Sequence, residues 1–255
     1  MTNKLGRLLL AAWLLVTGLG SWSMAATVVT GEALPSDGLF SSLSREAPRV
    51  LQQFYDASFF SEIASPVQFT AMSFRLPPIS AENYPSLGDL NFARYDITLA
   101  KPSAPSAAAD GLTSATFADN MVDPVVVRSG PLTIPQGSFI SNAENEPAEF
   151  SFDIQFDSPY DFMPGQDLVM LVRHSGHGDV HGVETRWNFD GHGWTNGSVV
   201  STENVDAAVG NFGPGSFNLA NKIEFTYVPE PSSVMLALAG ALFLPIICHY
   251  RPRRR

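Results

Sequence analysis

Between Thr27 and Val228 the chain alternates hydrophobic and polar residues over several short stretches, and no stretch keeps a helical period. A period of two is typical of β-strands with one buried face. The strands predicted from this pattern cover residues 50–55, 66–75, 92–99, 125–128, 132–134, 149–156, 167–173 and 222–228. Gly and Pro turns separate these stretches. The pattern therefore predicts an all-β fold, an antiparallel sandwich of jelly-roll type.

Several stretches carry finer expectations. The alternation in 66–75 places residues 67, 69, 71 and 73 on one face and residues 68, 70, 72 and 74 on the other. In 149–156 the three phenylalanines and Ile154 share one face. Residues 167–173 are nearly all apolar, as in a central strand buried on both faces. The best helix candidate is 39–51, with serines that could cap it, but Pro48 interrupts it.

The N-terminus has a different pattern. Lys4 and Arg7 precede an apolar stretch over residues 8–16, and Ser23-Met24-Ala25 supplies small residues after helix-breaking glycines. This order is that of a secretory signal peptide. We expect a signal helix within residues 1–25 and cleavage after Ala25 or Ala26.

The C-terminus joins a proline motif, an apolar segment and a basic tail. Pro229-Glu230-Pro231 precedes an apolar run over residues 234–248, and the tail carries Arg251, Arg253, Arg254 and Arg255. The run is shorter than the roughly 20 residues of a comfortable span, but flanking residues can extend it into the interfaces. The arginines should remain cytoplasmic and act as a stop signal. We expect one membrane helix, and three parts: 1–25, a body over 26–227, and 228–255.

This three-part ending resembles the PEP-CTERM sorting signal, with Pro229, Glu230 and Pro231 as its motif. The resemblance implies processing by an exosortase-type enzyme in a bacterium that makes extracellular polysaccharide. It implies a Gram-negative-type host, a transient inner-membrane anchor, and then a place on the cell surface or in the extracellular matrix. A plain C-terminal membrane anchor is the alternative interpretation.

The body also resembles ectodomains of other exported proteins that carry this signal. The likeness rests on three stretches, 69–75, 108–120 and 160–170, within a region from about Val50 to Arg173. It implies a β-sandwich and no activity.

Charge and cysteine content narrow the choice of partners. The formal charge is −10, and six of the 15 Lys and Arg residues lie in the end segments. An acidic body repels phosphate backbones, so nucleic acid is not an expected partner. Cys248 is the only cysteine, so no disulfide within the chain is expected.

Four of the five histidines lie within residues 174–192, namely His174, His177, His181 and His192. Neutral imidazoles on a flexible loop could bind zinc, nickel or copper, as in a metal-dependent hydrolase. The sequence lacks HExxH or any matching zinc spacing, and a polar loop after a buried strand explains the cluster equally well. We expect no metal, no other cofactor and no catalytic residue.

Trp187 and Trp194 flank polar residues and could form a platform on which sugar rings stack. Packing of these side chains inside the fold is the simpler interpretation. The sequence favours a non-enzymatic exported protein of structural or adhesive type, held in place through matrix polysaccharide. A secreted carbohydrate-binding module and a metal-dependent hydrolase are the alternatives.

Overall fold

The computed structural model describes residues 24–34, 37–39, 43–78, 80, 82–104, 111–142, 148–178 and 189–230. The chain divides into one compact unit, Ala26–Val228, and the two ends, Met1–Ala25 and Pro229–Arg255, which do not belong to it. The sheets lie in the compact unit.

Strands dominate the described residues, with two short 3₁₀ helices between them. In chain order the elements are β1 (Ala26–Val29), β2 (Asp37–Leu39), β3 (Arg49–Tyr55), η1 (Ala57–Phe60), β4 (Val67–Ser73), β5 (Leu90–Phe92), β6 (Tyr95–Pro102), η2 (Phe117–Asn120), β7 (Met121–Arg128), β8 (Leu132–Ile134), β9 (Asp153–Phe162), β10 (Leu168–His174), β11 (Phe189–Ser201), β12 (Phe212–Asn221) and β13 (Glu224–Pro229).

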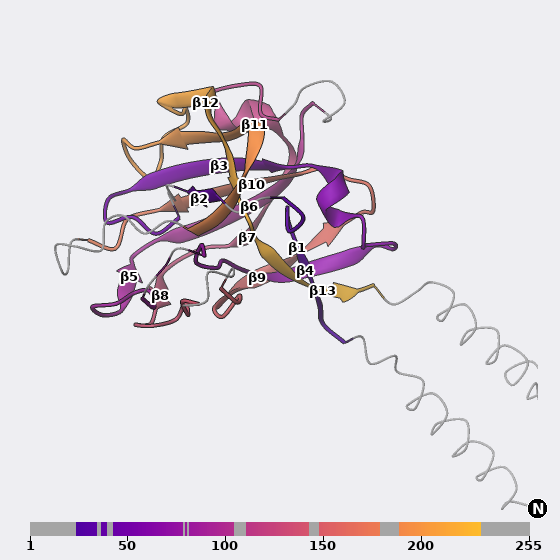
Figure 1. Cartoon of the computed structure of the whole chain (residues 1–255). Coiled ribbons are helices and arrows are strands. Elements are labelled where there is room, and N and C mark those ends of the chain that lie inside the picture. The colour runs from indigo at the N-terminus through magenta and orange to yellow at the C-terminus, as the bar shows by residue number, and fades with distance from the viewer. Residues whose placement is uncertain are drawn as a thin grey trace, which may run out of the picture. The chain divides into compact units, whose positions relative to one another are not determined.

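The strands form two main sheets (Figure 1). One sheet has the order β1-β13-β4-β9, and the other has the order β12-β11-β3-β10-β6-β7 with β2 paired to β11. A small third sheet joins β5 to β8. Each registered pair is antiparallel. The predicted all-β, antiparallel class is confirmed.

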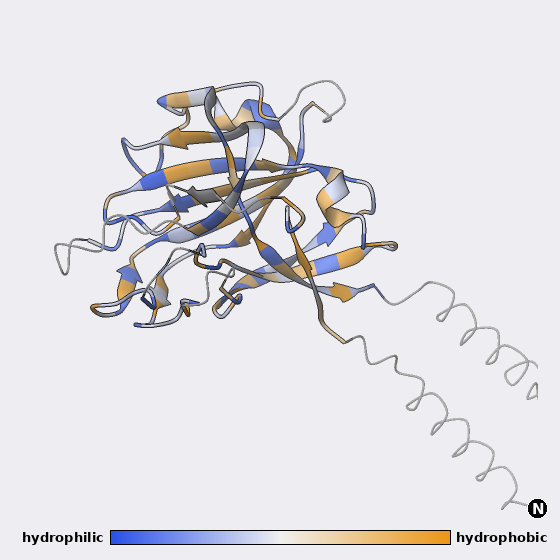
Figure 2. Ribbon diagram, viewed as in Figure 1, coloured by the Kyte–Doolittle hydropathy of each residue, from blue (hydrophilic) through white to orange (hydrophobic). Residues whose placement is uncertain are grey.

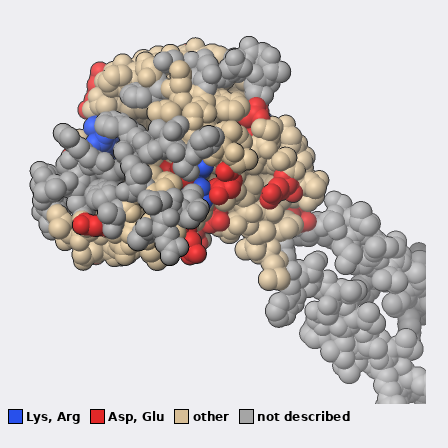
Figure 3. Space-filling model, in the orientation of Figure 1, with Lys and Arg blue, Asp and Glu red and all other residues tan. Residues whose placement is uncertain are grey.

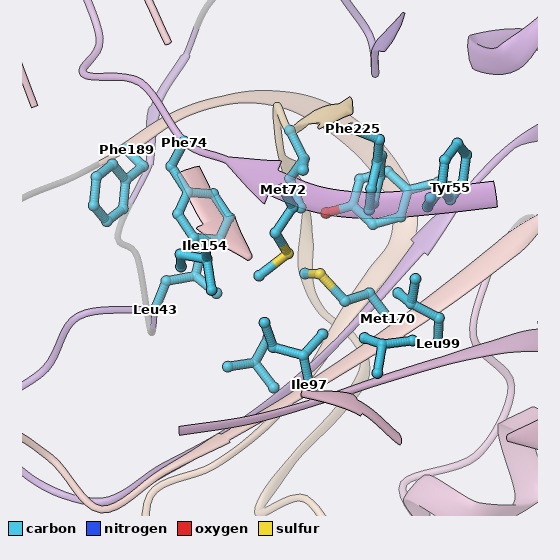
Figure 4. Close-up of a cluster of buried hydrophobic side chains, with 14 of the residues drawn as sticks. Leu43, Tyr55, Met72, Phe74, Ile97, Leu99, Ile154, Met170, Phe189 and Phe225 are labelled. Atoms are coloured by element: carbon cyan, nitrogen blue, oxygen red, sulfur yellow. The ribbon is translucent and has the colours of Figure 1, made fainter. Parts of the chain in front are cut away.

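The main hydrophobic core lies between the two large sheets. Phe69 and Met72 of β4 and Phe225 of β13 share one buried cluster with Tyr55 of β3 and Met170 of β10. Figure 4 shows the side chains of Met72 and Met170 pointing toward one another within this cluster. Hydrophobic residues recur along the strands in Figure 2. A core shared by two facing sheets makes the fold sandwich-like.

A second buried cluster covers the other face of the larger sheet. It joins Val50 and Phe54 of β3 and Val169 of β10 to Phe117 of η2. Asn120, at the end of η2, fastens this cover, because its side-chain amide donates to Gln52 Oε1 at 2.8 Å. Strand β10 is therefore buried on both faces, as its continuous apolar sequence predicts.

Two expectations about the bounds of elements were wrong. Residues 43–48 form bends rather than a helix, and β3 begins at Arg49, directly after Pro48. The strand predicted over 149–156 begins only at Asp153 and continues to Phe162. Ile154 reaches the core, while Phe152 and Phe156 are partly buried against it.

The predicted faces of β4 hold only for its first half. The pairing of β4 with β9 is irregular between Phe69, which lies opposite Tyr160, and Ala71, which lies opposite Gln155, so the extra residues belong to β9. Beyond this irregularity the core contacts of β4 pass from Val67 and Phe69 to Met72, rather than to Ala71 as strict alternation requires.

No helix among the described residues is long and apolar enough to cross a membrane. We expected a signal helix in 1–25 and a membrane helix in 228–255. Of these two ranges the structure describes only residues 24, 25 and 228–230, so both expectations lie outside the described residues.

Candidate functional site

The first and last strands of the compact unit pair with each other. In the antiparallel register of β1 and β13, Ala26 lies opposite Tyr227 and Val28 opposite Phe225. Strand β1 forms the edge of its sheet, so β13 has β1 on one side and β4 on the other. This terminal strand pair places both ends of the compact unit at one edge of the sandwich (Figure 1).

Buried hydrogen bonds hold the terminal strand pair closed. The backbone N–H of Thr30 donates to Ile223 O at 2.9 Å. The backbone N–H of Ile223 donates in return to the Thr30 hydroxyl oxygen, also at 2.9 Å. Both residues are fully buried, and Val28 and Phe225 belong to the main core. Strand β1 is therefore part of the packed fold.

An ion network, buried except at Glu32, extends the attachment of the N-terminal segment. Arg75 Nε lies 2.7 Å from Asp190 Oδ2, and Arg75 Nη2 lies 2.7 Å from Glu32 Oε2. Lys222 donates through Nζ to Leu34 O at 2.9 Å and lies 3.8 Å from Asp190 Oδ2. Because the charges are paired, this network stabilises a specific arrangement without leaving an isolated buried charge.

Gly31 follows β1 and has a left-handed φ of +65°. A Cβ atom at this position would lie 2.4 Å from Cδ2 of His192. The imidazole of His192 is fully buried and meets Phe59 edge-on, with ring centroids 5.0 Å apart. The turn after β1 can pack directly against His192 of β11 because residue 31 has no side chain.

The predicted sorting motif begins at the end of the last described strand. Strand β13 includes Pro229, and Glu230 is exposed immediately after it. Pro231 and the stop-signal arginines, Arg251, Arg253, Arg254 and Arg255, lie outside the described residues.

Glu224 begins β13 and lies opposite Val29 in the terminal strand pair. Burial raises the pKa of Glu224, and Asp153 adds to the rise, while a hydrogen bond from Thr27 and the charge of Arg75 oppose it. The charged form of this carboxyl group is thus disfavoured in the folded protein.

The histidines occupy two different aromatic environments. His174 is fully buried, stacked on Tyr95 with ring centroids 5.7 Å apart, and its Nδ1 accepts from the Gly176 N–H at 3.1 Å. His177 meets the ring of Phe92 at 5.6 Å.

His192 packs instead with Phe59 and Trp194, and His181 lies outside the described residues. Among the described residues, no group of three or more His, Cys, Asp or Glu side chains could hold a metal ion.

Trp194 is partly buried and meets the Phe59 ring at 5.2 Å. Its contacts lie within the fold, and Trp187, its partner in the predicted sugar platform, falls outside the described residues. The platform therefore stays a prediction.

A groove of about 490 Å³ runs between β1, the following turn and η1. Its lining residues include Phe59, Ser58 and Ser61, together with Glu32 and Glu62. This groove could not be predicted from the sequence, because it joins residues about thirty positions apart. Figure 3 shows acidic side chains at several places on one face, with basic side chains in small areas only.

These features define a sandwich-like all-β protein in which β1 and β13, the first and last described strands, pair at one sheet edge. No known family model matches the chain. A search of the curated proteins likewise found no match.

Proposed function

We propose that this chain is an exported cell-envelope or extracellular-matrix protein of structural or adhesive type, and not an enzyme. In this proposal the body is delivered by the signal peptide of residues 1–25. An exosortase-type enzyme then processes the PEP-CTERM signal at Pro229-Glu230-Pro231. The three-part C-terminus and the acidic charge of −10 support export over nucleic-acid binding.

The observation that carries the proposal is the coincidence of the last strand with the sorting motif. Strand β13 ends at Pro229, so cleavage after this point would remove no strand of the sandwich. Strand β1 begins at Ala26, so cleavage after Ala25 would remove none either. The sheets therefore occupy the part of the chain that both predicted cleavages would leave intact.

The proposal includes the finer features expected from the sequence. These are a jelly-roll strand order, a signal helix, and a C-terminal membrane helix stopped by the tail arginines. They also include a transient inner-membrane anchor in a Gram-negative-type bacterium and a final place at the cell surface or in the matrix, next to extracellular polysaccharide.

The test replaces Pro229, Glu230 and Pro231 together with alanine and follows the protein in its native host. We expect the variant to stay unprocessed in the inner membrane, while the wild type gives a shorter mature protein by intact mass. Pro164→Ala, at an exposed turn between β9 and β10, is the control and should be processed normally. Normal processing of the triple variant would refute the proposal.

Carbohydrate binding is a second candidate, favoured by the groove beside Phe59. An aromatic ring together with hydroxyl and carboxylate groups suits a sugar, which presents apolar ring faces and many hydroxyls. A polysaccharide pull-down should lose retention on Phe59→Ala if the groove binds, and on Trp187→Ala and Trp194→Ala if the predicted platform binds. Unchanged retention in all three variants would reject this function.

A further inference from the structure

The terminal strand pair limits how much extended chain is free around the sorting motif. Strand β13 is paired on both edges, to β1 and to β4, and β1 covers it from Glu224 to Tyr227. The apolar run begins at residue 234, so only residues 230–233 separate β13 from it. At full extension these residues span about 13 Å. The proposed processing site therefore lies within a few residues of both β13 and the predicted membrane segment.

Enzymes that bind extended peptides commonly add them as a strand, through free backbone N–H and C=O groups. With β1 in place, the edge of β13 that faces it offers no such groups over Glu224–Tyr227, and the other edge of β13 is paired to β4. When β1 detaches, one edge of β13 becomes free for pairing. This edge is continuous with the residues that follow Pro229. An exposed edge strand is a ready template for pairing with another chain.

We propose that β1 is a detachable cover strand whose pairing with β13 restrains processing at the sorting motif. This inference rests on the proposed function. It adds that a body already closed by β1 is processed more slowly than one in which β1 is still free. In the proposed export from the N-terminus to the C-terminus, β13 follows every other strand of the described residues, so closure of this pair competes in time with processing.

The register offers a covalent lock for the pair. Thr30 and Ile223 are joined by a backbone hydrogen bond, so alternation along the antiparallel pair makes Thr27 and Thr226 a non-hydrogen-bonded pair, in which side chains lie closest. A Thr27→Cys/Thr226→Cys variant should therefore form a disulfide on the outer face. The variant is made in a Cys248→Ser background, because Cys248 is the only native cysteine.

Processing is followed by pulse-chase and intact mass on the full chain in its native host. We expect the disulfide-locked protein to be processed several-fold more slowly than the same variant kept reduced. Val28→Ala, which weakens β1 packing, should speed processing, about tenfold for each 1.4 kcal/mol lost from the pair. Val67→Ala is the matched control, since Val67 is equally buried in β4 but lies outside the terminal strand pair.

The outcomes separate this inference from the proposed function. Equal rates for the locked and reduced forms, with processing still abolished by the Pro229-Glu230-Pro231 replacement, would overturn the inference alone. Equal acceleration by Val28→Ala and Val67→Ala would also overturn it, because general destabilisation would then explain the effect. Processing of the motif replacement itself would overturn the proposed function.

Discussion

Arg75 and Asp190 join the two sheets of the sandwich at a fully enclosed point. Arg75 Nε lies 2.7 Å from Asp190 Oδ2, and the backbone N–H of Asp190 donates to Arg75 O at 2.9 Å. Arg75 follows β4 in one sheet, and Asp190 belongs to β11 in the other. Through Glu32 and Lys222 the same point also holds the N-terminal segment. The attachment of β1 thus depends on residues far apart in the sequence.

Asp190→Asn should destabilise the protein strongly. The substitution keeps the size of the side chain but removes the charge that faces both Arg75 and Lys222, which are buried. Removing one partner of a buried ion pair leaves uncompensated charge, at a cost of about 3 kcal/mol or more. Chemical denaturation followed by circular dichroism measures this loss.

Asp123→Asn is the matched control for that experiment. Asp123 pairs with Lys101 at 3.3 Å, and the two side chains are 72% and 49% exposed. An exposed pair contributes at most about 1 kcal/mol. Equal effects of the two substitutions would mean that the network at Asp190 does not hold the sheets together.

Gly31→Ala should cost more than the conformation of the glycine alone explains. A left-handed backbone disfavours alanine by about 1–2 kcal/mol, and here the new Cβ also meets the buried His192 ring. Gly137→Ala isolates the first effect, because Gly137 has a φ of +74° and its Cβ would meet nothing within 4 Å. Thermal unfolding should rank Gly31→Ala as the less stable variant.

A double-mutant cycle identifies the contact responsible. In a His192→Ala background the ring is gone, so Gly31→Ala should cost no more than Gly137→Ala. The difference between backgrounds measures the coupling of the two positions. The same cost in both backgrounds would show that His192 is not the obstacle.

The sequence predicted the fold class well, because the period-two pattern records which residues face a core. It failed where geometry departs from the pattern. The irregular pairing of β4 with β9 leaves no mark in the local residues, and Met72 lies in the main core although alternation places it with Gln68. Gly-rich β11 and β12 have no clear alternation, and they were missed.

The candidate site was predictable only in part. The predicted sorting motif is a local pattern that the sequence can suggest and that remains a prediction, whereas the ion network joins positions 32, 75, 190 and 222, which only the folded chain brings together. Strand β1 was also missed, because four residues beside the predicted signal peptide carry no periodic signal. The spacing of the histidines, in contrast, suggested that they lie close together. In the folded chain His174 and His177 lie in one aromatic environment and His192 in another.

Met72→Ala tests the exchanged faces of β4. Because Met72 is fully buried in the main core, truncation should cost about 2–5 kcal/mol. Thr70→Ala, two residues earlier, should lose about 1 kcal/mol or less, since Thr70 is partly buried and donates one hydrogen bond to Thr226 O at 3.3 Å. Denaturant midpoints of the two variants provide the comparison. A larger loss for Thr70→Ala would contradict the exchange of faces along β4.

Glu224→Gln should stabilise the protein at neutral pH. Burial raises the pKa of Glu224, so the folded state holds its proton more firmly than the unfolded chain does. Wild-type stability from this group is then fully present below the ordinary glutamate pKa of about 4.3, and it is lost as pH rises through the raised pKa. Glutamine stays neutral and avoids the loss, a gain below about 1 kcal/mol at this partly exposed site. Denaturation at pH 7 and near pH 4 should show the gain only at pH 7.

Asp96→Asn should show the opposite pH dependence. Burial alone would raise the pKa of Asp96, but hydrogen bonds from Arg94, the Gly130 N–H and Ser129 outweigh it, and the pKa is lowered. The charged form therefore stabilises the fold above the ordinary aspartate pKa of about 3.9, and this contribution disappears as pH falls through the lowered value. The asparagine variant should be less stable than the wild type at pH 7, and the two should converge in acid. If both substitutions shifted stability in the same direction at pH 7, the contrast between the two carboxyl environments would be wrong.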